Sequence, residues 1–202
     1  MLTLLGRDNS ASVQKIMWLC DECNIEFIRE DVDQHASPFL KLNPNGKIPC
    51  VIDDDFAIWE SNAILQYLGT KHALTHWCPT DLRVSTRVRQ WIDWSSCEAY
   101  RAAEPVWIGM VKMPIRQRNH AAIDSGRKVW SSKFAILDQH LADNTYVAGD
   151  TITLCDIPLA ILAYRWYGLP MKREHYPNLK RWYDSIAARP AFQKNVIDIG
   201  IR

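Results

Sequence analysis

The sequence predicts a small α/β unit with a mixed four-stranded sheet, followed by an all-helical unit. Up to Leu68, strand and helix signals alternate in the order β-α-β-α-β-β-α, which is typical of a compact α/β domain. From Asp81 onward the apolar residues follow helical spacing. Between the two parts the periodicity lapses over residues 71–79. We therefore expect one domain over residues 1–76 and a second over residues 82–202.

The chain opens with a strand, a loop and a helix. The short apolar run of residues 2–6 is typical of a buried strand. The loop of residues 7–11 leads into a helix with apolar side chains on one face, at Val13, Ile16, Met17 and Cys20. Residues 25–30 are the second predicted strand.

A turn and a hairpin complete the α/β unit. Ser37 and Pro38 begin a short helix, and residues 43–46, Asn-Pro-Asn-Gly, are a strong turn signal. The apolar runs 50–52 and 56–59 flank three aspartates and predict a hairpin. Residues 60–68 then return to helical spacing.

Helices account for the second half. A long helix begins after Asp81, and we expect it to kink or stop by Pro105. Pro114 begins another segment, and Gly149-Asp150 separates two later helices.

Charge and composition exclude several classes of partner. The 24 basic and 23 acidic residues give a net charge of +1, with no basic run for a nucleic acid or an acidic membrane surface. No apolar stretch has the length of a bilayer span or of a signal sequence, so we expect a cytoplasmic protein. The six scattered cysteines predict reduced thiols, and Cys20-Cys23 lacks the second pair that a zinc site needs, so no metal is expected.

The segment of residues 43–61 predicts a receptor for a peptide-like ligand. A proline before a strand is awkward, and a cis Ile48-Pro49 bond would turn the backbone of Ile48 outward to pair with an extended ligand. Ser61, at the start of a helix, can hold a carboxylate, and Glu60 can meet an ammonium. Lys47 supplies a cation for a second carboxylate. Glutathione has all three features, although Glu60-Ser61 alone is equally typical of an ordinary helix start.

Three motifs in order resemble cytosolic glutathione S-transferases. They are Asn-Pro-x-Gly-x-Ile-Pro followed by Trp59-Glu60-Ser61-Asn62-Ala63-Ile64, the N-terminal run 6–15 of the bacterial members, and residues 148–158, which resemble the family's helix-capping motif around Thr153 and Asp156. The resemblance spans nearly the whole chain. It implies a thioredoxin-like N-terminal domain, an all-helical C-terminal domain, glutathione as co-substrate and a homodimer.

The chemistry of such an enzyme depends on the glutathione thiol. Its pKa of about 8.5 leaves little thiolate at neutral pH, so the enzyme must supply a hydrogen-bond donor. The loop before the first helix offers Asn9, Ser10 and Ser12. The serine motif of plant-type members favours Ser10, a second alignment places Asn9 there, and a plain helix-capping role for Ser10 or Ser12 is the alternative. This loop contains no cysteine, which argues against exchange through a mixed disulfide.

Other residues are assigned by their place in the resemblance. His35 lies in a segment that often brings a histidine to the glycyl end of glutathione, and a solvated loop histidine is the alternative. The electrophile is expected between the domains, near Trp107, Met110, Val111 and Trp166, all of which are equally compatible with a core position. Arg7, at the end of the first strand beside the thiol site, is placed to steer an anionic leaving group, and a merely exposed arginine is the alternative.

The sequence leaves the reaction open among three functions. A transferase that conjugates the thiol to a small apolar electrophile is favoured. A glutathione-dependent reductase or peroxidase on the same scaffold is one alternative, because the sequence indicates the residues that bind the thiol and not the second substrate with which the thiol reacts. A non-catalytic glutathione-binding module is the other.

Overall fold

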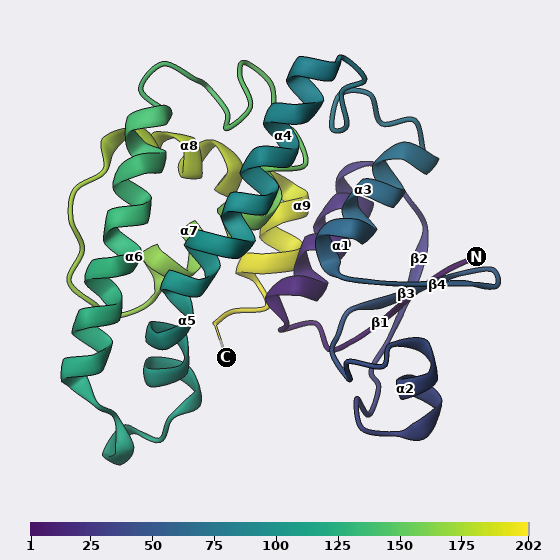
Figure 1. The fold of residues 1–202 in the computed structure, drawn as a ribbon, viewed down its shortest axis with the longest axis horizontal. Coiled ribbons are helices and arrows are strands. Elements are labelled where there is room, and N and C mark those ends of the chain that lie inside the picture. Colours follow the sequence, from purple (N-terminus) through teal and green to yellow (C-terminus); the bar gives the residue numbers. More distant parts are fainter. Residues whose placement is uncertain (202) are drawn as a thin grey trace. The chain divides into compact units, whose positions relative to one another are not determined.

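A computed structural model describes residues 1–201, and the chain packs as two compact units (Figure 1). The first unit combines Met1–Cys78 with Ala188–Gly200, and the second contains Pro79–Ala187. No helix among residues 1–201 is both long and apolar enough to cross a membrane. In the same range, no three His, Cys, Asp or Glu side chains gather in an arrangement that could hold a metal ion.

The first unit is a four-stranded mixed sheet with helices on both faces, as the sequence predicts. Its elements up to Cys78 are β1 (Leu2–Leu5), α1 (Ala11–Glu22), β2 (Phe27–Glu30), α2 (Ser37–Leu42), β3 (Cys50–Asp53), β4 (Phe56–Trp59) and α3 (Ser61–Lys71). The strand order is β2-β1-β3-β4, with β1 parallel to β2 and the other two pairs antiparallel. Figure 1 shows α1 and α3 on one side of this sheet and α2 on the other.

Successive side chains of β1 point to opposite faces of the sheet and contribute to the core on each face. Leu5 and Cys50, which are partners in the β1–β3 register, pack with Phe39 of α2. Leu4 and its partner Val51 are fully buried and point to the opposite face. The two cores hold β1 and β3 in the middle of the sheet. Because these strands are antiparallel, the loop that leaves β1 and the segment that enters β3 lie at the same end of the sheet.

The last residues of the first unit come from the C-terminus of the chain. Residues 188–200 are predicted to belong to the helical domain, whereas in the structure α9 (Pro190–Phe192) and the π-helical turn Gln193–Ile197 pack on α1. The ring of Phe192 lies 4.8 Å from that of Trp18, edge to face, and the Arg189 guanidinium pairs with Glu22. Periodicity could not reveal this return, because it reports which residues are helical and not which core they fill.

The second unit is all-helical. Its elements are α4 (Leu82–Trp94), a π-helical stretch (Ser95–Tyr100), α5 (Arg101–Trp107), a second π-helical stretch (Ile108–Lys112), a 3₁₀ turn (Ile115–Gln117), α6 (His120–His140), α7 (Asp156–Gly168) and α8 (Pro177–Ala187). Of the kink or stop predicted by Pro105, the stop is wrong, because α5 passes through that residue to Trp107. The two π-helical stretches flank α5, and such stretches are one way for a helix to take up a local break in its hydrogen-bond ladder.

A cluster of aromatic rings forms part of the core of the second unit. Trp130, Phe134 and Trp166 have no solvent exposure, and their ring centroids lie 5.1–5.7 Å apart in tilted or edge-to-face pairs. Helix α7 is apolar on nearly all sides and is buried over most of its length, as expected for a central helix.

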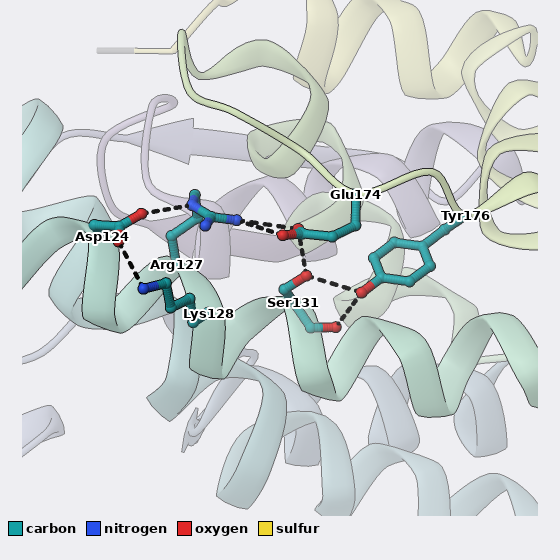
Figure 2. Close-up of polar contacts among 6 residues, drawn as sticks. All are labelled: Asp124, Arg127, Lys128, Ser131, Glu174 and Tyr176. Carbon is teal, nitrogen blue, oxygen red and sulfur yellow. Dashed lines mark hydrogen bonds and ion pairs between the residues drawn. The ribbon is translucent and has the colours of Figure 1, made fainter.

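A polar network joins α6 to the loop that follows α7 (Figure 2). The Glu174 carboxylate accepts from the Arg127 guanidinium at 2.8 and 3.0 Å and from the Ser131 hydroxyl at 2.5 Å. Tyr176 donates to the Ser131 carbonyl at 2.9 Å, and Arg127 also pairs with Asp124 at 3.1 Å. Hydrogen bonding from Ser131 and Arg127 lowers the pKa of Glu174 below its ordinary value.

Glu174→Gln should lower the free energy of unfolding at pH 7 by about 1–2 kcal/mol. A broken buried ion pair costs more, but the Glu174 side chain is 43% exposed and solvent screens it. Because the folded-state pKa of Glu174 is depressed, its contribution is present above the unfolded pKa of about 4.3 and is lost as pH falls through the folded value. Urea unfolding at several pH values should show that the free energies of unfolding of the wild type and of Glu174→Gln become equal at acid pH. Asp124→Asn, an exposed partner of the same arginine, is the control and should change stability less.

Candidate glutathione site

The loop after β1 is held close to Ile48 by a glycine. Gly6 has φ of +145°, and a side-chain Cβ there would lie 2.7 Å from a methyl of Val13 and 3.0 Å from Cβ of Ile48. Both the conformation and the lack of space exclude larger residues. The loop that leads to α1 therefore runs directly beside the segment before β3.

The three candidate thiol donors lie at the start of α1. Ser10 is the N-cap residue, with extended dihedral angles of −78° and 122°, yet its side chain makes no capping hydrogen bond. A plain capping role for the Ser10 hydroxyl is therefore wrong. Ser12 lies in the first turn and is half-buried. The Asn9 side-chain oxygen is buried and has no hydrogen-bond partner within the described residues.

Ile48 and Pro49 precede the sheet without joining it. The Ile48-Pro49 bond is cis, as predicted from the proline before the strand. Strand pairing begins at Cys50, which is opposite Leu5 and Trp59, so the backbone of Ile48 lies beyond the hydrogen-bond ladder. An extended ligand could add to this edge as a further short strand.

A buried asparagine shapes the turn that leads to Ile48. The Asn43 side chain donates to the Lys47 carbonyl at 2.6 Å and accepts from the Asn45 N–H at 3.1 Å. The turn is predicted from the sequence, but this role of Asn43 is not, although an asparagine that precedes Pro-x-Gly is a typical signal for it. The Lys47 side chain is exposed at the end of this turn.

Glu60 and Ser61 form the start of α3. Glu60 is the N-cap residue with φ of +70°, a conformation rarely adopted outside glycine. Such strain is often found at ligand-binding positions. The Glu60 side chain is exposed, whereas Ser61 is only 7% exposed and receives a hydrogen bond at 3.2 Å from Lys15 of α1.

His35 and Arg7 lie at the side of this region. His35 is exposed in the loop before α2, where its backbone N–H donates to Asp33. Arg7 is exposed too, and its guanidinium donates at 3.0 Å to Gln34 when the Gln34 amide is oriented so that its nitrogen donates to the Gly46 carbonyl. That contact places the Arg7 side chain beside the loop that precedes α2.

The residues expected around the electrophile divide into two groups. Trp166 is fully buried in the aromatic core, so its place as an open pocket wall is wrong. Trp107, Met110 and Val111 are half-buried. The Arg165 guanidinium lies 3.6 Å above the Trp107 ring, which makes that face partly cationic rather than purely apolar. A separate hollow of about 370 Å³ in this unit is lined by other residues, among them Pro105, Ile108 and Met113.

The cysteine pair of α1 is a poor candidate for redox chemistry. Burial raises the pKa of Cys20 to about 12 and that of Cys23 to about 11, so neither thiol supplies much thiolate at neutral pH. All six cysteines are free, in agreement with the expectation of reduced thiols.

Comparisons with known proteins identify the family. Residues 1–70 match the family model described as the N-terminal domain of glutathione S-transferase, and residues 102–190 match the model of its C-terminal domain. Glutathione S-transferase GstB of Escherichia coli is 34% identical, with 98% of both chains covered. Glutathione S-transferase 3 of Zea mays is 31% identical over 98% of this chain and 94% of its own.

A solved structure supports the same assignment. The theta class glutathione S-transferase of Xanthomonas axonopodis pv. citri, solved with glutathione bound, superposes with a TM-score of 0.93 at 30% identity over 97% of each chain. The likeness covers both the α/β unit and the helical unit, and the sequence relatives match along almost the full length. The chain therefore belongs to the glutathione S-transferase family.

Proposed function

We propose that this protein binds glutathione in its first unit and conjugates the thiol to a small apolar electrophile. The observation that carries the proposal is the Ile48 backbone, which lies outside the sheet ladder, directly beside the loop that starts α1. A cysteinyl backbone paired at Ile48 brings its thiol toward that loop. The family assignment and the glutathione-bound relative favour the same ligand.

Each end of glutathione then has a matching group. The γ-glutamyl carboxylate binds at the Ser61 hydroxyl and the first N–H groups of α3, where the helix dipole favours an anion. Glu60 pairs with the γ-glutamyl ammonium. Lys47, which precedes Ile48 in the chain, and His35 are both exposed and take the glycyl carboxylate.

The reaction needs a thiolate at neutral pH. A donor at Ser10, Asn9 or Ser12 stabilises the sulfur anion, and the thiol proton passes to solvent. The sulfur electron pair then forms a bond to the electrophilic carbon while the leaving group departs with its bonding pair.

Titration calorimetry should detect glutathione binding, and Ser61→Ala should weaken it about tenfold, because a hydrogen bond to a charged carboxylate is lost. Conjugation is followed by absorbance with 1-chloro-2,4-dinitrobenzene as the electrophile. Ser132→Ala, which removes an exposed hydroxyl bonded only to a backbone carbonyl of α6, is the matched control and should leave both readouts unchanged.

Two outcomes would contradict this assignment. Binding without turnover on any electrophile would favour the non-catalytic module, and turnover of an organic hydroperoxide alone would favour the peroxidase.

The family resemblance also implies a homodimer, and six free thiols suit a reducing cytoplasm, so we infer both for this protein.

A further inference from the structure

We propose that Lys15 is a positioning residue for glutathione, holding and polarising the Ser61 hydroxyl so that it donates to the γ-glutamyl carboxylate. This inference rests on the proposed function and adds a residue of α1 to it. Lys15 lies in the middle of the first helix, remote in sequence from the turn and the hairpin that suggest a ligand site. Nothing in its spacing distinguishes it from an ordinary helix residue.

The contact joins two helices at the site. The Lys15 ammonium donates to the Ser61 hydroxyl oxygen at 3.2 Å and to the Asn62 side-chain oxygen at 3.2 Å. Lys15 and Ser61 are each 7% exposed. A lysine is almost never buried so deeply without a specific use for its charge. Here the charge lies next to the first two residues of α3.

The direction of the hydrogen bond determines what Ser61 can do. A hydroxyl has one hydrogen to donate and two acceptor lone pairs. Because the ammonium occupies a lone pair of Ser61, the hydroxyl hydrogen remains for an outside acceptor. Withdrawal of electron density by the ammonium makes that hydrogen a stronger donor, since linked hydrogen bonds reinforce each other.

The buried charge also adds to the field at the start of α3. A helix N-terminus carries about half a positive charge, which attracts anions. A full ammonium charge directly behind Ser61 strengthens this attraction in a place shielded from solvent. Both effects act on the carboxylate of the ligand and leave its peptide backbone and its thiol untouched.

The decisive experiment compares two ligands. One is glutathione, and the other is γ-aminobutyryl-Cys-Gly, which keeps the amine but lacks the γ-glutamyl carboxylate. Calorimetry should show that Lys15→Met raises the Kd for glutathione about tenfold and leaves the Kd for the analogue unchanged. Lys15→Gln, which keeps a donor without the charge, should give a smaller loss and remains available if the methionine disturbs folding. Lys194→Met, which removes an exposed ion pair to Asp21 on the same helix, should alter neither value.

The outcomes distinguish failure of the role of Lys15 from failure of the proposed glutathione binding. An equal loss for both ligands would mean that Lys15 only supports the fold, and no loss for glutathione would exclude any role; either result overturns the inference. If the wild-type protein does not bind glutathione at all, both the inference and the proposed function are wrong.

Discussion

Ser10→Ala is expected to slow conjugation near neutral pH by about ten- to a hundredfold. A hydrogen bond to a charged group contributes about 1.5–3 kcal/mol, and its loss leaves the bound thiolate without its donor. The structure favours Ser10 because its hydroxyl is at the N-terminus of α1 and is not engaged in capping the helix. The fold of the variant should be unchanged, since no hydrogen bond within the first turn depends on that hydroxyl.

The pH profile distinguishes loss of the donor from a general disturbance. Without its donor the bound thiol returns toward a pKa of about 8.5, so the deficit should be large at about pH 6.5 and small at about pH 9. Stopped-flow absorbance at saturating glutathione measures the conjugation rate at each of the two pH values. Asn9→Ala and Ser12→Ala serve as parallel variants. A normal profile for Ser10→Ala, together with a shifted profile for Asn9→Ala, would transfer the role to Asn9.

The architecture of the first unit could be predicted because its signals are local. Short apolar runs at residues 2–6 and 50–59 fix strands, and helical spacing fixes α1 and α3, within a few residues of the observed bounds. The cis bond before Pro49 followed from the conflict between a proline and a strand. These features depend on neighbouring residues, so periodicity and turn chemistry suffice to find them.

Long-range contacts explain what the sequence missed. Helix α5 passes through Pro105, and residues 188–200 return to the first unit, because packing partners far along the chain decide both. The sequence does not distinguish a core position from a pocket position for Trp166, because aromatic residues suit both, and in the structure Trp166 is fully buried. Lys15 ends the run 6–15 that resembles the bacterial members, but the sequence does not place it at the ligand site, because a lysine in a helix is normally solvated. Only the three-dimensional structure places it against Ser61.

Asp156→Ala is expected to cause the largest loss of stability, about 3–5 kcal/mol. Asp156 is completely buried and accepts hydrogen bonds from the Val147 N–H at 3.0 Å, the Thr153 N–H at 2.8 Å and the Trp182 indole at 2.9 Å. Alanine leaves all three donors buried without partners, and each such loss costs about 1–3 kcal/mol. The helix-capping motif predicted around Thr153 and Asp156 is present on the Asp156 side, where the carboxylate accepts from the Thr153 N–H. In the other direction, the Asp156 N–H donates to the backbone carbonyl of Thr153.

Asp156→Asn separates the acceptor role from the charge. The asparagine side-chain oxygen can accept the hydrogen bonds on one side of the site, but its amide N–H groups then face donors on the other side. We therefore expect a loss of stability smaller than that of the alanine variant. Urea unfolding followed by tryptophan fluorescence measures all variants, with Asp143→Ala as the exposed control. Burial raises the pKa of Asp156, which shows that burying its charged form has a cost. The alanine variant tests whether the acceptor oxygens of this carboxyl group stabilise the fold by more than that cost. A loss below about 1 kcal/mol would show that α7 begins without this cap, and the segment around Thr153 would then no longer count as a folding element.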